Sequence, residues 1–223
     1  MAGRNIPLAT GEFYHVFNRG IAHQPVFLTK RDYERASLGL SYYRFAKPPF
    51  KLSRFKSLSH DEKNNVLTSL NENSDVLVKI ISFVLMPNHF HFLLQQAKDR
   101  GISIFLSKFT NSYTKYFNIK NKRAGDLLQG VFKAVRVETE EQLLHLSRYI
   151  HLNPLVSFVV KEKNFLYYPW SSLPDYLQGK SSLGWTEPVL SSFSSPNEYK
   201  NFIFDQVDYA KELEKIKHLT FEG

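Results

Sequence analysis

The chain contains no cysteine among its 223 residues. This absence excludes disulfide bonds, a thiol nucleophile and zinc sites with cysteine ligands. Long apolar runs are also missing, because none reaches the roughly 20 residues that a membrane-spanning helix needs. The first residues, Met1 to Asn5, lack the apolar core of a signal peptide. We therefore expect a cytoplasmic protein with no membrane partner.

Negative charge is scarce relative to positive charge. The 29 Lys and Arg residues outnumber the 21 Asp and Glu residues, which gives a formal net charge of +8 and an isoelectric point near 9.5. Such an excess favours a polyanionic partner. The hydrophobic content of 43% is ordinary for a globular protein, and the length suffices for one sizeable core.

Apolar periodicity and turn residues predict an alternation of strands and helices. The order is strand, helix, strand, strand, helix, strand, helix, over residues 12–19, 29–43, 76–86, 89–95, 102–118, 131–137 and 140–153. This is the order of the split βαβ, ferredoxin-like α+β fold. We expect an antiparallel sheet with helices on one face, its other face open, and one additional C-terminal helix.

Two regions lie outside this core pattern. Residues 45–75 are polar with little periodicity, and we interpret them as an inserted loop with a short helix near Asp61 to Leu70. Beyond the core, a last amphipathic helix is predicted from Pro196 to about Lys217. The expected organisation is a domain over residues 1–175 and a helical C-terminal extension over residues 176–223.

Two histidines, His89 and His91, flank Phe90 in a predicted strand. Side chains two apart in a strand share a face, so both imidazoles could bind one cation. Neutral imidazole is a common metal ligand. Histidines in strands are more often half-buried polar residues, so the spacing alone leaves both interpretations open.

A second pair, Tyr149 and Asn153, lies four residues apart on the last core helix and shares a helix face. A tyrosine hydroxyl is a competent nucleophile, and an asparagine carbonyl oxygen is a suitable ligand for Mg²⁺ or Mn²⁺. The alternative is a core tyrosine beside an asparagine that ends the helix before Pro154. Because proline restricts the residue before it, the helix is predicted to stop there.

The combination of both pairs resembles the single-tyrosine HUH transposases, and within them it is most similar to the REP-associated tyrosine transposases. Further similar segments are Tyr14–Gly20, Tyr113–Asn118, Gln129–Lys133 and Tyr168–Ser172. The resemblance spans roughly residues 10 to 175.

This resemblance implies a transposase that acts as a metal-dependent endonuclease and strand transferase on single-stranded DNA with hairpin-forming ends. His89, His91 and Asn153 would hold Mg²⁺ or Mn²⁺ against the scissile phosphate. Tyr149 would form a 5′-phosphotyrosine and release a 3′-hydroxyl. The covalent link stores the energy for rejoining, so no nucleotide cofactor is expected. A monomer and a homodimer both remain possible.

Other candidate side chains receive lesser roles. Tyr113 and Tyr116 are rival nucleophiles, but their spacing indicates packing. His15 either lines the open face or is structural, His145 is expected on the surface, and His151 is given no role.

DNA contacts are expected from basic residues around the open face and its bordering loops: Arg19, Lys115, Lys120, Lys122, Arg123, Lys133 and Arg136. Two alternatives remain: a non-catalytic module that binds single-stranded nucleic acid, and a nickase of the rolling-circle replication type.

Overall fold

The computed structural model describes residues 8–179 and 185–207. Its core elements follow the predicted order: β1 (Phe13–Arg19), α1 (Lys30–Tyr43), β2 (Val78–Met86), β3 (His89–Gln96), α4 (Gly101–Lys120), β4 (Lys133–Val137) and α5 (Glu140–Val156). The strands form one antiparallel sheet in the order β2-β3-β1-β4. The predicted ferredoxin-like fold is therefore confirmed.

The inserted segment is more helical than its sequence indicated. It contains the predicted helix as α3 (His60–Glu72), and also α2 (Leu52–Ser57), which we did not predict. The α2 helix buries Leu52 and Phe55, and the Phe55 ring stacks on Tyr42 of α1 at 4.4 Å between centroids. Such a short helix depends on these tertiary contacts, because it is below the length at which a helix is stable alone.

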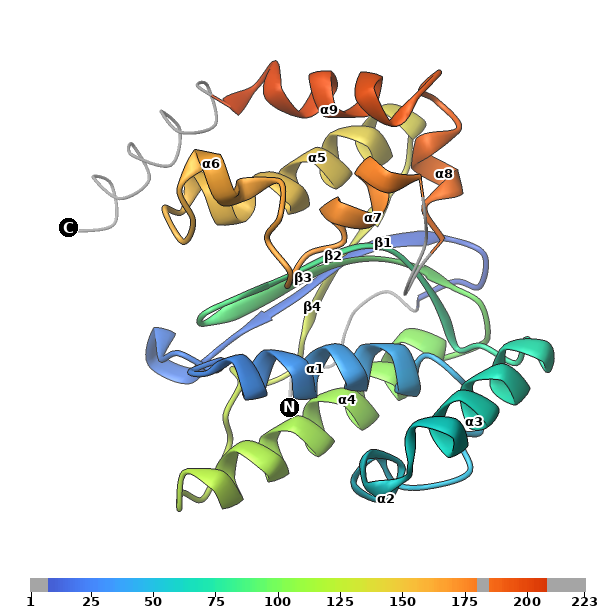
Figure 1. The fold of residues 1–223 in the computed structure, drawn as a ribbon, viewed down its shortest axis with the longest axis vertical. Coiled ribbons are helices and arrows are strands. Elements are labelled where there is room, and N and C mark those ends of the chain that lie inside the picture. Colours follow the sequence, from blue (N-terminus) through green and yellow to red (C-terminus); the bar gives the residue numbers. More distant parts are fainter. Residues whose placement is uncertain (1–7, 180–184, 208–223) are drawn as a thin grey trace.

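One face of the sheet is covered by α1 and α4 (Figure 1). Alternate strand residues, among them Val16, Phe90 and Phe92, point toward these helices and are fully buried. They pack against Phe105 and Phe109 of α4. This face therefore holds the larger hydrophobic core, and the neighbouring strand positions, including His15 and His91, point to the opposite face.

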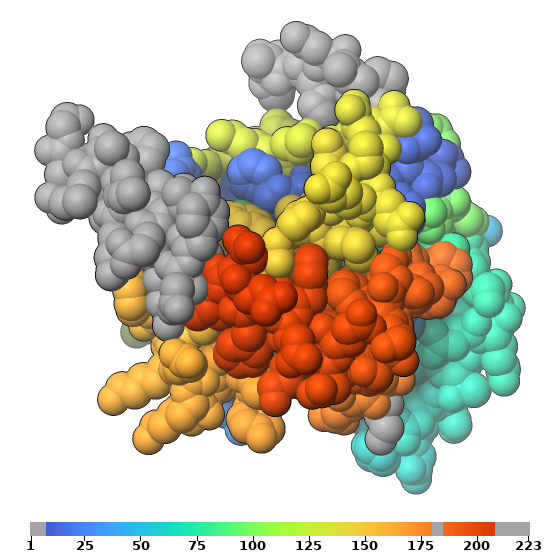
Figure 2. Space-filling view, turned by 90° about the horizontal axis from the view of Figure 1, so that it is seen from above, coloured from blue at the N-terminus to red at the C-terminus, as the bar shows by residue number. Residues whose placement is uncertain are grey.

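We expected the opposite face of the sheet to be open, and this expectation is wrong. This face is covered by α5 and by four later helices: α6 (Glu162–Phe165), α7 (Leu173–Gln178), α8 (Glu187–Leu190) and α9 (Pro196–Phe204). In Figure 2 the orange and red residues of this C-terminal part occupy the centre of the molecular surface on that side. They bury a second core that includes Ile81, Val84 and Leu93. The nearly continuous apolar run of β2 reflects its burial on both faces.

The Tyr168–Ser172 segment has a structural role at the exposed edge of β2. The Leu85 amide donates to the Trp170 carbonyl at 2.8 Å, and the Ser172 amide donates to the Phe83 carbonyl at 3.0 Å. These hydrogen bonds cover an edge that would otherwise present unpaired backbone groups. The segment thereby anchors the C-terminal helices to the sheet.

His151, to which the sequence assigned no role, joins α5 to the helices that follow it. Its buried imidazole contacts the Tyr199 hydroxyl and the Ser172 hydroxyl, both at 2.7 Å. Because both ring nitrogens are engaged, this side chain fixes α5 relative to α9 and to the edge of the sheet.

The burial of His151 predicts an acid-sensitive fold. Burial lowers the pKa of His151 from 6.5 to about 3, so the folded state binds this proton less readily than the unfolded state. The corresponding stability is present above pH 6.5 and is lost as the pH falls toward 3. Between pH 7 and pH 5, we expect a loss of about 2 kcal/mol in urea-unfolding free energy. A His151→Gln variant should lose this part of the pH dependence; an unchanged dependence would contradict the assignment.

Two sequence predictions concern the C-terminal region. The last helix begins at Pro196 as predicted and is described to Phe204, whereas its predicted continuation to Lys217 lies outside the described residues. The division into residues 1–175 and 176–223 stays a prediction. Within residues 8–179 and 185–207, no helix combines the length and the apolar character needed to cross a membrane.

Candidate active site

Two elements place a tyrosine against a histidine pair on the second face of the sheet. His89 begins β3, and His91 follows on the same face with its ring centroid 5.0 Å from that of His89. The Tyr149 ring, from α5, lies edge-on to His91 at 5.5 Å between centroids. Tyr149 is 42% exposed, so its hydroxyl-bearing ring is accessible to a substrate. The structure therefore brings three of the predicted site residues together.

The orientation of His89 is determined by the residue before it. Its Nδ1 lies 2.6 Å from Oδ1 of Asn88, whose Nδ2 donates to the His23 carbonyl at 3.3 Å. A carbonyl oxygen only accepts, so His89 Nδ1 carries the proton and the lone pair of the ring lies on Nε2. A metal-binding histidine is commonly oriented in this way. Asn88 is not among the predicted site residues, although a polar residue in the turn before the histidine is a signal that the sequence contains.

His15 orients the imidazole of His91. It lies on β1, and its Nε2 is 2.9 Å from Nδ1 of His91. Burial lowers the pKa of His15 to about 4, which makes its ring neutral at ordinary pH. A neutral His15 can accept the Nδ1 proton of His91, and this leaves the lone pair of His91 on Nε2. The ring of His15 also lies 6.0 Å from that of Tyr149, so it belongs to the same cluster.

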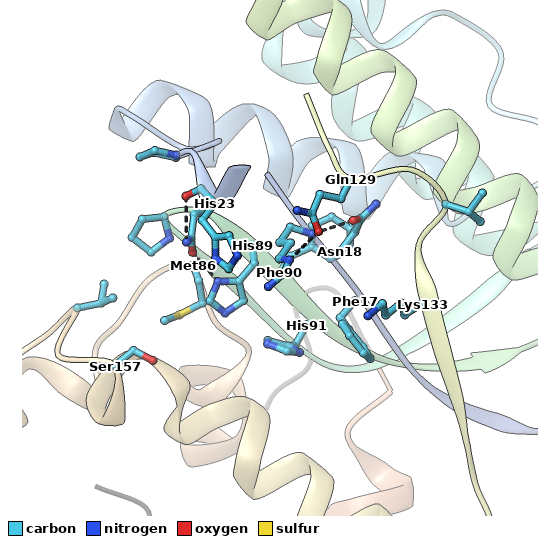
Figure 3. A pocket seen from close by; sticks show the side chains of 16 residues that line it. Phe17, Asn18, His23, Met86, His89, Phe90, His91, Gln129, Lys133 and Ser157 are labelled. Carbon is cyan, nitrogen blue, oxygen red and sulfur yellow. Dashed lines mark hydrogen bonds between the residues drawn. The ribbon is translucent and has the colours of Figure 1, made fainter. Parts of the chain in front are cut away.

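A cavity of about 590 Å³ opens beside the histidines (Figure 3). It is lined by the ends of β1 and β3 and by the segment that enters β4. Arg19 and Lys133 give it positive charge, and Nε of Arg19 donates to Oε1 of Gln129 at 2.6 Å. In the sequence, Gln129 is notable only as part of the segment Gln129–Lys133 that resembles the family. Its contact with Arg19 becomes visible only in the folded structure.

Asn153 lies on α5 next to Tyr149 and is buried. Its Nδ2 donates to the Tyr149 carbonyl at 2.8 Å. The predicted helix end at Asn153 is wrong, because α5 continues through Pro154 to Val156. Burial of residues 154–156 offsets the local restriction that proline imposes. The backbone of Asn153 is therefore helical, and its role as a metal ligand stays a prediction.

The rival side chains are elsewhere. The Tyr113 hydroxyl donates to the Val26 carbonyl at 2.5 Å, and the Tyr116 hydroxyl donates to Asp32 at 2.9 Å. Both belong to α4, on the other side of the sheet, so their packing role is confirmed. His145 is about half exposed and contacts Arg148.

The predicted basic residues do not form one cluster. Arg19 and Lys133 line the cavity, and Arg136 pairs with Glu12 at 2.9 Å. The remaining four, Lys115, Lys120, Lys122 and Arg123, lie on α4 or directly after it.

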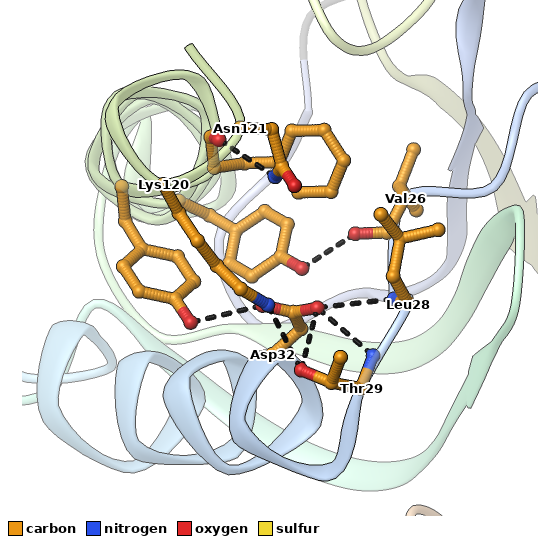
Figure 4. Close-up of polar contacts among 9 residues, drawn as sticks. Val26, Leu28, Thr29, Asp32, Lys120 and Asn121 are labelled. Carbon is orange, nitrogen blue, oxygen red and sulfur yellow. Dashed lines mark hydrogen bonds and ion pairs between the residues drawn. The ribbon is translucent and has the colours of Figure 1, made fainter.

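The expected grouping around one face is therefore wrong, because α4 packs on the opposite face of the sheet. Lys120 forms an ion pair with buried Asp32 at 2.6 Å, within the network in Figure 4. Whether these residues bind DNA stays a prediction.

Comparison with known proteins supports the family resemblance. The sequence model of the family described as "Transposase IS200 like" matches residues 51–153. A REP-associated tyrosine transposase, solved bound to a REP hairpin, is similar in structure with a TM-score of 0.52 and 16% identity. That similarity covers 83% of this chain and 91% of the other.

A tRNA(His) guanylyltransferase from Saccharomyces cerevisiae has a TM-score of only 0.33 at 16% identity, over 90% of this chain and 74% of that one, and is too distant to bear on the fold. No curated protein matches the chain in sequence. The resemblance carried by the two motifs is thereby confirmed: this chain is similar in sequence to the IS200-like transposases and has the fold of a REP-associated tyrosine transposase.

Proposed function

We propose that this protein is a metal-dependent endonuclease and strand transferase that acts on single-stranded DNA. The observation that carries the proposal is the contact of an accessible tyrosine, Tyr149, with the oriented imidazole of His91, at 5.5 Å between ring centroids. One chain supplies both groups. A merely structural tyrosine would not require a neighbouring pair of histidines whose Nδ1 atoms are both engaged.

Tyr149 would act as the nucleophile. Its hydroxyl oxygen attacks the scissile phosphorus and loses its proton, while the bond from phosphorus to the 3′ oxygen breaks. The departing 3′ oxygen gains a proton, and the 5′ phosphate remains linked to Tyr149. Attack by a 3′-hydroxyl on this link reverses the step and joins DNA, so no external energy source is consumed.

The proposed site would hold a divalent cation. His89 and His91 would present Nε2 to it, and Asn153 would contribute Oδ1, since its Nδ2 donates to the helix backbone. The described part of the chain contains no group of three His, Cys, Asp or Glu side chains that could hold a metal ion. The proposed site differs from such a group because its third ligand is an amide. When bound, Mg²⁺ or Mn²⁺ would supply Lewis-acid stabilisation of the phosphate charge.

The expected substrate is single-stranded DNA with a hairpin. The similar solved structure is of a transposase bound to a REP hairpin, which makes hairpin-forming ends the first substrates to test. Arg19 and Lys133, which line the cavity, would contact the phosphates next to the scissile bond.

A denaturing gel tests the proposed function. The protein is mixed with 5′- and 3′-labelled single strands, with and without hairpins, in Mn²⁺. We expect a protein band that carries only the DNA 3′ of the cut and resists denaturant, since the 5′ phosphate is retained on the enzyme. No such band on any substrate would favour a nucleic-acid-binding module over an enzyme.

Replacement of His15 should lower the affinity of the protein for Mn²⁺. A His15→Phe variant keeps a ring of similar size but removes the acceptor for Nδ1 of His91. Loss of such a partner typically lowers metal affinity by about 10- to 100-fold. Mn²⁺ binding, followed by calorimetry, measures this directly. A His15→Gln variant should restore part of the affinity, whereas equal affinity in all three proteins would contradict this role for His15.

A further inference from the structure

A second cavity lies on the other side of the sheet, in a groove that is lined by residues of α1, α2 and α4. Its volume is about 750 Å³. Because α1 and α4 cover the face of the sheet opposite to His91 and Tyr149, the groove is separated from the cavity beside the histidines by the sheet and its core. Nothing in the proposed reaction uses it.

Positive charge is concentrated in this groove. Each of the three helices contributes two cations: Arg31 and Arg35 from α1, Lys51 and Lys56 from or beside α2, and Lys108 and Lys115 from α4. None of the lining residues in the described part of the chain is acidic. Lys120, at the end of the groove, is already paired with Asp32 at 2.6 Å (Figure 4). The groove is therefore positively charged.

Two of these cations, Arg35 and Lys108, are held in place by contacts within the protein, whereas the other four side chains are exposed. Arg35 is only 8% exposed, and its Nη2 donates to the Ser112 hydroxyl at 3.3 Å. Its guanidinium carbon lies 5.7 Å from the centre of the Tyr116 ring. Lys108 donates to the Ala46 carbonyl at 2.9 Å. Burial lowers the pKa of Lys56, and repulsion from Arg31 and Arg35 lowers it further by a smaller amount.

Charges of one sign held this close repel one another and favour a bound polyanion. Two of the lysines that line the groove, Lys108 and Lys115, lie seven residues apart on α4. At 1.5 Å per residue this is about 10 Å along α4, so the two side chains can contact different phosphates of one DNA strand. Tyr116 and the exposed Ile119 also line the groove, so it offers apolar surface to sugars and bases.

The chain segment between α4 and β4 leads from the groove to the cavity beside His89 and His91. The groove ends near Lys120, the last residue of α4, and the cavity is lined from Gln129 to Lys133. The connecting segment carries two cations, Lys122 and Arg123, and one carboxylate, Asp126. DNA that extends beyond the cavity could follow this segment around the sheet. We propose that the groove between α1, α2 and α4 is a second DNA-binding site, which holds backbone phosphates of the substrate away from the scissile bond.

This inference rests on the proposed function for the identity of the ligand, and binding tests it separately from catalysis. The protein is used with Tyr149→Phe, so that no covalent product forms, and fluorescence anisotropy measures its affinity for a labelled hairpin with a single-stranded extension. The test variant adds Lys56→Gln and Lys115→Gln; both side chains are exposed, so the fold should persist. Thermal unfolding checks this.

Loss of two phosphate contacts should reduce the slope of log affinity against log salt concentration by about 1.4 to 1.8, and the affinity at 0.1 M salt by about 25- to 60-fold. The matched control is Lys161→Gln with Lys200→Gln, which removes the same charge outside both cavities. It should change the affinity and the slope far less. Equal effects of both pairs would show only a general charge effect and would overturn the proposal.

Two competitors separate other ligands from DNA. If inorganic phosphate or polyglutamate binds the parent protein but not the Lys56/Lys115 variant, while hairpin affinity is the same in both, then the groove binds small phosphates or acidic peptides and the proposal is wrong. Adduct formation by the Tyr149-containing protein is measured in parallel. Its absence would overturn the proposed function, whereas the binding comparison would still report on the groove.

Discussion

A Tyr149→Phe variant should form no covalent adduct with single-stranded DNA, with a loss of cleavage of about 10⁴-fold or more. The substitution removes only the hydroxyl oxygen, which would form the bond to phosphorus. The phenylalanine ring can keep its edge-on contacts with His15 and His91, so the fold and the DNA affinity should be retained. Denaturing gels measure the adduct, and anisotropy measures binding.

Controls come from the other tyrosines. Tyr167 is 77% exposed, more than Tyr149, and Tyr116 was a rival nucleophile in the sequence. Tyr167→Phe and Tyr116→Phe should both retain adduct formation. If adducts survive in Tyr149→Phe, mass spectrometry of the labelled peptide would identify the true nucleophile and our assignment would be wrong.

A His89→Ala variant should lose cleavage of single-stranded DNA by about 10³-fold or more, since electrostatic stabilisation of the phosphate by a bound metal contributes several kcal/mol. His89 is preferable to His91 for this test. It is half-buried at the start of β3, whereas His91 is 8% exposed and packs against the rings of His15 and Phe17. Cleavage rates across a series of Mg²⁺ and Mn²⁺ concentrations measure the effect.

The matched control is His145→Ala, which removes a histidine one turn before Tyr149 on α5. His145 is about half exposed, and its described contacts are with Arg148, Glu141 and the Phe202 ring. We expect it to cleave DNA at a rate within a factor of about 3 of the parent protein. Cleavage by His89→Ala at the rate of the control would refute the metal role of His89.

The order and type of the core elements were predictable because each carries a local signal. Thr29 and Asp32 form a capping box at the N-terminus of α1, with the Thr29 amide donating to Asp32 at 2.9 Å. Alternating residues in β1 and β3 bury one side of each strand. These signals act within a few residues of the chain, so they can be read without the fold.

The covering of the second face was not predictable in the same way. The short helices α6, α7 and α8 have weak signals of their own, and they are held by contacts such as those of His151 with Ser172 and Tyr199. These partners lie 21 and 48 residues from His151 in the chain. The prediction that Lys115 and Lys120 lie near Arg19 is wrong for a related reason. The position of α4 in the sequence does not determine which face of the sheet it covers.

The sequence by itself determined the ferredoxin-like order and the identity of the chemical groups: His89 and His91 on one strand face, and Tyr149 and Asn153 on one helix face. Strand and helix periodicity suffices for such pairs. Only the tertiary structure decided that Tyr149 meets His91, that Asn88 and His15 orient the imidazoles, and that α1, α2 and α4 form a basic groove. These contacts join residues far apart in the chain, and their geometry depends on how whole elements pack.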